Sequence, residues 1–417
     1  MIKLTNILPV NNNKVNRLHL LTTAFFLALF TFPVLPLKVT NILLMSLAAF
    51  TLFSFFLKPF PVGKLILRNL VFVIPFLPYL VELCISGFNP AARFEFEKKI
   101  LFFTAPLIIP LFMKVTGFKN YRLAFLIFSF SVVALTIYTF SLVFIKGIPF
   151  ADTAYENGAF IFRDSFEKFS GLHPTYFSIF ALTSACFLCF ASDSRSTAFR
   201  VSCYVLAALL FVAVLLVAVR IAFITAAVFL LVWIIKSKLS LKGKFSMGVS
   251  VVAVMLLLSV CLPSLKNRFS EIGSSATTGS LDENTVSQRM MILHCSLQVF
   301  SDNIWTGTGS RHFQEKLNDC YNSQGWTMST QRNFNPHNQF LSEGVNYGIF
   351  ALLVFLACLF IIFRRVFRMD EGLYFSIAII LFFLSESMLE RQMGVYFFGL
   401  IAILIYNLQI SNGHASE

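Results

Sequence analysis

The sequence predicts an all-α protein that crosses a membrane about twelve times. Of its 417 residues, 57% are hydrophobic and only 13% are charged, whereas soluble domains average about 25% charged residues. Apolar runs near the roughly 20 residues that a spanning helix needs recur along the chain. Within lipid, backbone polar groups must be bonded inside the protein, and a helix bonds them within its own segment.

The apolar runs give the order of the expected spans. They lie at 19–36, 41–57, 66–84, 100–116, 122–145, 173–191, 200–218, 221–235, 246–262, 338–362, 372–388 and 394–410. The first run is too long for a signal peptide and is followed by no small-residue cleavage site, so we expect it to stay as an anchor.

One apolar stretch, 201–235, has a single charge, Arg220, and no Gly, Pro or Asn to mark a turn. As one helix it would be far too long for a bilayer. Both of its flanks are basic, and two spans joined by a tight turn would keep both flanks on the inner side. We therefore expect a helical hairpin that turns at Arg220.

The Lys and Arg residues indicate the orientation of the chain. With the N terminus inside, 18 of them lie in inner segments and 9 in outer ones, the long segment 263–336 left aside. The expected regions are 1–262 with nine spans, an outer, periplasmic loop region at 263–336, and 337–417 with three spans and a short cytoplasmic tail. The net charge of +13 then reflects topology, and we expect no nucleic-acid partner.

The outer segment 263–336 is too long for a plain connector, so we expect it to fold on top of the bundle. Apolar residues recur at helical spacing in 286–300, and "DNIWTGTGS" should end that helix. Cys295 and Cys320 both lie in this segment and could pair in an oxidising compartment, but sequence does not fix their separation. Neither a metal-ligand pattern nor a nucleotide-binding motif is present, and we expect no metal and no cofactor.

A histidine stands at the start of the tenth expected span, in "NPHNQFLSEGVNYG". We expect Asn335 to cap the helix, and Pro336 and His337 to occupy its first turn. The helix dipole there disfavours an imidazolium, so His337 would be a neutral imidazole able to accept a proton. Gly344 and Gly348 share its helical face and would let a neighbouring helix approach closely. The alternative is a histidine that only anchors the helix at the membrane interface.

Two arginines fall on the same outer side. Arg220 lies at the tight turn and would face a polar cavity, unless it reaches lipid phosphate. Arg289 lies in the loop helix and could instead be a solvated charge. A neutral histidine with two arginines is typical of a general base beside a diphosphate clamp, although a generic anion site has the same composition.

Weaker candidates for substrate binding lie nearby in the expected topology. His173 and Tyr176 begin the sixth span, and Asn338 follows the histidine of the tenth. Glu386 and Glu390, near the outer end of the eleventh span, are four residues apart and would share a helical face. They could bind sugar hydroxyls or an arginine.

These stretches resemble the O-antigen ligase and polymerase superfamily of bacterial envelope glycosyltransferases. The resemblance is carried by "PHNQFLSEGVNYGIFALLVF", by "SQRMMILHCSLQVFSDNIWTGTGS" inside the long loop, and by "LLVAVRIAFITAAVFLL" around Arg220. The family often has Ser before this arginine, where this chain has Val219. That difference weakens a hydrogen-bonding role at the position and leaves the cation.

The resemblance implies a metal-independent, inverting, GT-C-like glycosyltransferase in the bacterial inner membrane, with its site facing the periplasm. The donor would be a glycan on undecaprenyl diphosphate, whose prenyl chain would lie among the spans, and lipid A-core would be the acceptor. His337 would activate the acceptor hydroxyl, while Arg220 and Arg289 would hold the diphosphate. A polymerase that extends glycans on the carrier, and an oligosaccharyltransferase acting on protein, remain alternatives. A lipid-linked sugar transporter would predict mid-span charges and inverted repeats, which are not evident.

Overall fold

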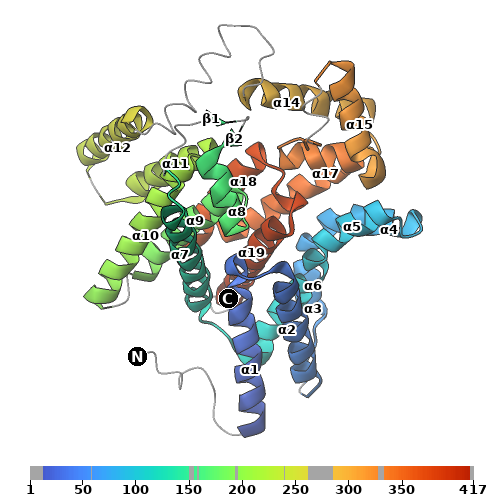
Figure 1. Cartoon of the computed structure of the whole chain (residues 1–417). Coiled ribbons are helices and arrows are strands. Elements are labelled where there is room, and N and C mark those ends of the chain that lie inside the picture. The colour runs from blue at the N-terminus through green and yellow to red at the C-terminus, as the bar shows by residue number, and fades with distance from the viewer. Residues whose placement is uncertain are drawn as a thin grey trace.

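The computed structural model describes residues 13–57, 59–149, 155–156, 159–192, 196–238, 240–261, 285–326 and 333–413. Apart from a hairpin of two-residue strands, β1 (Tyr155–Glu156) and β2 (Ala159–Phe160), the regular structure in these ranges is helical (Figure 1). The expected all-α architecture is confirmed in this form. Part of the expected loop region 263–336, namely 263–284 and 327–332, lies outside the described residues, as does the end of the tail at 414–417.

The N-terminal half begins with two apolar helices and a broken one. Its elements are α1 (Asn13–Leu29), η2 (Phe32–Val34), α2 (Leu37–Leu57), α3 (Gly63–Asn69), η3 (Leu70–Phe72), η4 (Ile74–Phe76), α4 (Leu77–Ile85), α5 (Pro90–Lys99), α6 (Leu101–Thr116), α7 (Tyr121–Ile145), α8 (Ile161–Ser170) and α9 (Pro174–Ser192). The expected span 66–84 is bent by 53° between α3 and α4. Pro75 and Pro78 lie at this break, where they remove backbone donors that a continuous helix needs.

The C-terminal half contains the hairpin, the loop helices and the last spans. Its elements are α10 (Thr197–Val217), α11 (Arg220–Lys236), α12 (Leu241–Cys261), α14 (Thr285–Asp302), α15 (Gly309–Ser323), α17 (Gln339–Val366), α18 (Asp370–Ser385), η5 (Met388–Glu390) and α19 (Gln392–Gly413). The helix expected at 286–300 is confirmed as α14, and it ends within "DNIWTGTGS" as expected.

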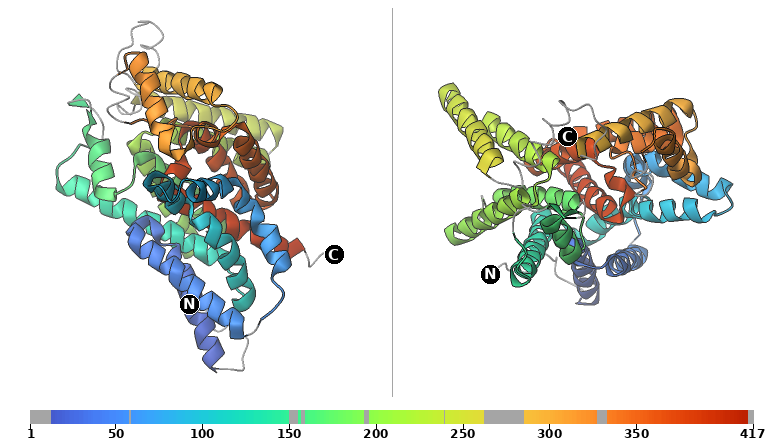
Figure 2. Two further views of the ribbon diagram at one scale, coloured as in Figure 1. Left: turned by 90° about the vertical axis from the view of Figure 1, so that its right-hand side faces the viewer. Right: turned by 45° about the horizontal axis from the view of Figure 1, so that its top comes forward.

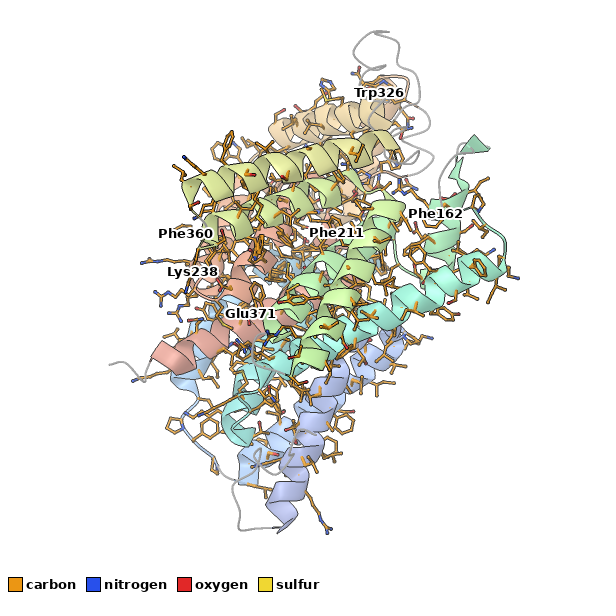
Figure 3. The ribbon with its side chains drawn as sticks, turned by 90° about the vertical axis from the view of Figure 1, so that its left-hand side faces the viewer. Phe162, Phe211, Lys238, Trp326, Phe360 and Glu371 are labelled. Carbon is orange, nitrogen blue, oxygen red and sulfur yellow. A yellow bond between two sulfur atoms is a disulfide. The ribbon has the colours of Figure 1, made fainter. Side chains whose placement is uncertain are left out.

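Seven helices in the described part of the chain are long and apolar enough to cross a membrane, or eight if α3 and α4 count as one bent span. The expected number of twelve is not confirmed. One reason is that α1, α11 and α18 have only 17, 17 and 16 residues, and at about 1.5 Å per residue they fall short of the roughly 30 Å hydrocarbon core. Phe360 on α17 is 68% exposed and points outward (Figure 3), which is typical of a lipid-facing surface. The chain is a multi-pass membrane protein.

The break between two helices expected at Arg220 is confirmed, although α11, with 17 residues, is too short to count as a span. The first helix, α10, ends at Val217, and Ala218 takes a left-handed backbone conformation with φ 53°. This residue donates its N–H to the carbonyl of Val214, which closes the end of α10. Helix α11 then begins at Arg220, so the guanidinium stands at a helix N terminus.

Helices α14 and α15 form a small unit at one end of the bundle, against α17 (Figures 1 and 2). A disulfide between Cys295 and Cys320 joins the two helices, which resolves the pairing that the sequence left open. Beneath it, α14 and α15 pack through Ile292 and Leu317 against Val345 of α17. The unit is therefore tied to the helix that follows His337.

The segment after α14 inserts into a break in α17. The break lies at Gly348, whose φ of 78° and ψ of −175° are not helical. The backbone of the inserted segment takes up the freed groups: Ile349 N–H donates to the Ile304 carbonyl at 2.7 Å, and Thr308 N–H donates to the Val345 carbonyl at 2.8 Å. The glycine contact expected below His337 therefore exists, but at Gly348 the neighbour is the turn at 303–306 rather than a helix.

Replacing Gly348 with Ala should destabilise the protein. A Cβ there would lie 2.4 Å from the Trp305 carbonyl oxygen, and the positive φ adds strain of about 1–3 kcal/mol. Thermal unfolding of the purified protein should show a clear fall in midpoint. The matched control is Gly63→Ala, where a Cβ would meet no atom within 4 Å and the midpoint should hold. Equal midpoints for the two variants would contradict the tight contact.

Candidate functional site

Five of the residues singled out in the sequence line one cavity of about 340 Å³. They are His173, Arg220, Arg289, His337 and Glu386. They come from the start of α9, the start of α11, α14, the segment before α17 and the segment after α18. The fold therefore brings together groups that are up to 213 positions apart in the chain.

His337 does not lie in the first turn of a helix, as the sequence analysis expected. Its φ is 46°, and α17 begins two residues later with Asn338 as its cap, whose side chain accepts from the N–H of Leu341. Asn335 instead forms a local turn, because its side-chain oxygen accepts from the N–H of His337 at 3.1 Å. The left-handed backbone is costly for a residue with a side chain, and such strain is concentrated at functional sites.

The ring of His337 is hydrogen-bonded to Glu386. Its Nδ1 lies 3.0 Å from Oε2 of Glu386, a carboxylate whose side chain is only 11% exposed. An ionised carboxylate can only accept, so Nδ1 carries the hydrogen in the neutral ring. The other nitrogen, Nε2, then has a lone pair that can accept a proton.

Glu386 also binds Arg289, so it bridges two residues that the sequence analysis treated separately. Nη2 of Arg289 lies 3.3 Å from Oε1 of Glu386, and Nη1 donates to the Ser385 carbonyl at 3.3 Å. Burial acts to raise the pKa of Glu386, but the hydrogen bond from His337, the positive charge of that ring when protonated, and the positive charge of Arg289 outweigh it and hold the pKa below its ordinary value. Glu386 is therefore ionised at neutral pH. Its expected contact with an arginine is present.

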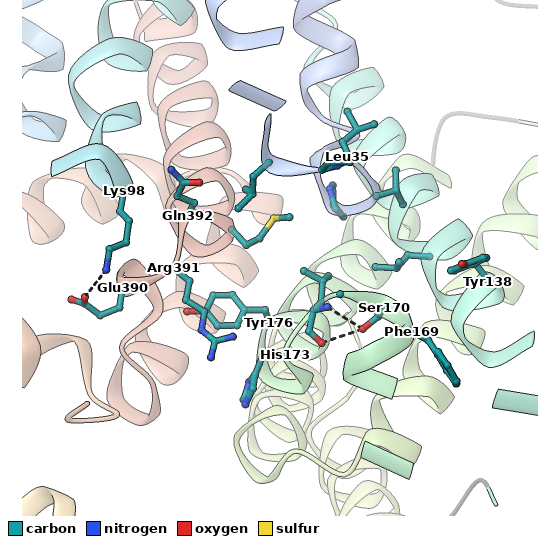
Figure 4. A pocket seen from close by; sticks show the side chains of 18 of the residues that line it. Leu35, Lys98, Tyr138, Phe169, Ser170, His173, Tyr176, Glu390, Arg391 and Gln392 are labelled. Carbon is teal, nitrogen blue, oxygen red and sulfur yellow. Dashed lines mark hydrogen bonds and ion pairs between the residues drawn. The ribbon is translucent and has the colours of Figure 1, made fainter. Parts of the chain in front are cut away.

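The expectation that Glu386 and Glu390 share a helical face is wrong. Helix α18 ends at Ser385, and Glu386 has an extended backbone with φ −151° and ψ 145°. The chain then turns through η5, so Glu390 faces away toward Lys98 of α5, whose Nζ lies 3.7 Å from Oε2 (Figure 4). Hydropathy placed the end of this span at residue 388, but α18 ends at Ser385, where Glu386 begins to make its polar contacts.

Asn338 and Tyr176 hold the segment that carries Glu386. The N–H of Asn338 donates to the Ser387 hydroxyl at 3.2 Å, and its side-chain amide donates to the Leu384 carbonyl at 3.1 Å. The hydroxyl of Tyr176 donates to the Met388 carbonyl at 2.9 Å. These bonds give both residues a role in positioning, while direct substrate binding by them remains a prediction.

His173 lies where two cavities meet, since it lines both the small cavity and a larger one. Burial lowers the pKa of His173 to about 4, so the ring is neutral at physiological pH. Its Nδ1 accepts from the N–H of Thr175 at 3.3 Å, which leaves the hydrogen on Nε2. His173 can therefore donate a hydrogen bond to an oxygen of a bound molecule.

Arg163 of α8 also lines the small cavity and was missed in the sequence analysis. Residues 146–172 read as an outer loop, but 161–170 form an amphipathic helix whose Phe162 and Phe166 are buried. That 3.6-residue pattern was the available signal. With Arg220 and Arg289, three arginines line a cavity that also contains the His337 ring.

The larger cavity, of about 1100 Å³, is lined mostly by apolar side chains from α1 to α2, α7 and the end of α8. Its polar end contains His173 and Arg391 (Figure 4). The guanidinium of Arg391 lies 5.8 Å from the centroid of the Tyr176 ring. The arrangement is a mostly apolar chamber next to the smaller cavity, and its polar lining includes Lys98 and Arg391 together with Glu97 and Glu390, so it suits an amphiphile with a polar head.

Residues 205–356 match the family model described as O-antigen ligase (Wzy_C). This match covers about a third of the chain and supports a relationship to the O-antigen ligase superfamily. It covers Arg220, Arg289 and His337, whereas His173 and Glu386 lie outside it. The match supports a membrane enzyme of the ligase or polymerase type that acts on lipid-linked glycans. No curated protein matches the chain.

Replacing Glu386 with Gln should lower kcat strongly, by about 10²-fold, because His337 loses the carboxylate that orients its ring and stabilises its protonated form. Initial rates of glycan transfer in reconstituted membranes would measure this. The chain offers a matched control in Glu315→Gln, since Glu315 makes the same contact with His312, at 2.9 Å, on the exposed face of α15. An unchanged kcat in Glu386→Gln would remove Glu386 from the site.

Proposed function

We propose that this protein transfers O-antigen or a related surface glycan from undecaprenyl diphosphate to lipid A-core, at the periplasmic face of the bacterial inner membrane. The observation that carries the proposal is the hydrogen bond between His337 and Glu386, 3.0 Å long, beside a cavity lined by arginines. A base with an orienting carboxylate and fixed cations for a phosphate leaving group are the parts that glycosyl transfer from a diphosphate requires.

In this mechanism Nε2 of His337 removes the proton from the acceptor hydroxyl. The hydroxyl oxygen forms a bond to the anomeric carbon of the donor sugar as the bond from that carbon to the diphosphate oxygen breaks. The electron pair leaves with the diphosphate. A single displacement of this kind inverts the anomeric centre and needs no carboxylate nucleophile, in contrast with retaining glycosidases. Glu386 remains ionised and stabilises the imidazolium that forms.

The arginines stabilise the leaving diphosphate. Arg220 stands at the N terminus of α11, and Ala218, Val219 and Ile221 beside it also line the cavity, so backbone N–H groups and the helix dipole favour an anion there. Arg289 uses Nη1 and Nη2 on Ser385 and Glu386, and its planar guanidinium retains further N–H groups for a phosphate oxygen. Arg163 adds a third cation.

The larger cavity would hold the first isoprene units of the donor. Its apolar walls suit a hydrocarbon chain, and its polar end at His173 adjoins the small cavity where the diphosphate would lie. His173, with its hydrogen on Nε2, would donate to a phosphate oxygen. A lipid-linked substrate would thus extend through both cavities.

The test is surface-glycan profiling of a host that lacks this protein, complemented with the wild type, His337→Ala or Arg220→Ala. We expect the wild type to restore a glycan ladder on lipid A-core, and both variants to accumulate intact polymer on the prenyl carrier. The matched cation control is Arg93→Ala, because Arg93 lines neither cavity and its pair with Glu97 on α5 is exposed. Membrane levels of all variants are compared.

Two outcomes would change the assignment. Full activity of His337→Ala, at normal membrane level, would make that residue a helix anchor and contradict its role as base. Loss of chain extension, rather than of attachment to lipid A-core, would make the protein a polymerase of the same superfamily.

A further inference from the structure

The peptide of Leu389 is held on both sides by side chains from two other helices. Its N–H donates to the side-chain oxygen of Gln339 at 2.6 Å, and its carbonyl accepts from Nζ of Lys99 at 2.6 Å. Both side chains are fully buried, with 0% exposure. Leu389 lies in η5, three residues after Glu386, so this contact acts on the segment that carries the carboxylate.

The same side chains belong to a closed ring of contacts. The amide of Gln339 donates to Oε1 of Glu343 at 2.9 Å, and the hydroxyl of Tyr79 donates to Oε2 of the same carboxylate at 3.1 Å. The ring of Tyr79 in turn lies 5.0 Å from Nζ of Lys99. Helices α4, α5 and α17 are thereby joined around Leu389, and each member of such a network restrains its neighbours.

Burying the charged side chain of Lys99 in this position costs free energy. It lies within a helix that is apolar enough to span a membrane, and a buried ammonium there requires compensation. Two carboxylates lie within ion-pair range of its Nζ but beyond hydrogen-bond distance, Glu95 at 3.8 Å and Glu390 at 3.9 Å. Its short contact is the bond to the Leu389 carbonyl. The lysine is therefore directed at the turn after Glu386 rather than at a close ion pair.

The catalytic pair needs such a restraint, because neither of its members belongs to a helix. His337 precedes α17 and has a left-handed backbone, while Glu386 follows the last residue of α18 with an extended one. Gln339 is two residues after His337, and Leu389 is three residues after Glu386. The bond between Gln339 and Leu389 therefore fixes the distance between the two non-helical segments that carry His337 and Glu386.

We propose that Lys99 and Gln339 are positioning residues for the His337–Glu386 pair. Neither side chain lines the small cavity or the larger one, so neither touches a substrate bound there. They act by fixing the η5 turn, and through it the carboxylate of Glu386 against the imidazole. This inference rests on the proposed function, since it assigns the two residues to its catalytic pair.

The test is a double-mutant cycle on the full-length protein in reconstituted membranes, with kcat and KM for both substrates. Gln339→Met is the mild variant. Lys99→Met combined with Glu95→Gln is the second, because it removes the donor to Leu389, keeps the net charge unchanged and changes no residue that lines either cavity. Each is measured alone and in the Glu386→Gln background. The matched stability control is Asn407→Leu, which breaks a buried amide pair with Asn69 at the far end of α19.

We expect each positioning variant to lower kcat about tenfold or more with KM within about twofold, since small displacements of reacting groups are costly. In the Glu386→Gln background the same changes should lower kcat less than about twofold, because the residues act through Glu386. Asn407→Leu should lower the unfolding temperature and leave kcat unchanged.

Other outcomes would overturn the proposal in distinguishable ways. If the kcat losses of the positioning variants and of Glu386→Gln simply multiply, Lys99 and Gln339 do not act through Glu386, although the proposed function stands. If Glu386→Gln alone leaves kcat unchanged, the proposed catalytic pair and its positioning residues both fail.

Discussion

The site depends on one hydrogen bond between a ring nitrogen and a carboxylate, which links the beginning of α17 to the end of α18. His337 and Glu386 both lie just outside helices, where backbone positions are not fixed by the helical repeat. Their 3.0 Å contact therefore needs support from elsewhere. Arg289 forms an ion pair with the carboxylate of Glu386, and Gln339 accepts a hydrogen bond from Leu389 in the η5 turn that follows. Several buried polar side chains near the site therefore help to fix the distance between His337 and Glu386.

Polar backbone in a membrane protein must find partners, and this requirement shapes the end of the bundle that contains the site. Where α17 breaks at Gly348, the segment after α14 supplies the missing partners. That insertion, together with the Cys295–Cys320 disulfide, ties α14 to α17. The helix that carries Arg289 and the helix that follows His337 are thereby held together, so these two residues keep their relative positions at the small cavity.

Features that depend on local pattern were predictable from the sequence. Charge asymmetry and length predicted the helix break at Arg220, and apolar spacing predicted α14, so two of the three arginines of the site, Arg220 and Arg289, could be placed. Features set by contacts distant in sequence were not. Asn335 and Asn338 are equally good caps by residue type, and the bonds of Asn338 to the last turn of α18 and to Ser387 decide between them. Lys99 lies between two expected spans, and no local pattern in the sequence predicts that its side chain donates to the carbonyl of Leu389.

The most direct test of the central claim is the protonation pattern of the His337 ring, measured by ¹⁵N NMR of histidine-labelled protein in lipid nanodiscs. The chain has only six histidines, so a His337→Gln spectrum assigns the signals. At a pH where the enzyme is active, the account predicts a protonated Nδ1 and an unprotonated Nε2, with the Nδ1 signal changed in Glu386→Gln. A ring protonated at Nε2 only, or a spectrum indifferent to Glu386, would contradict the role of His337 as the base.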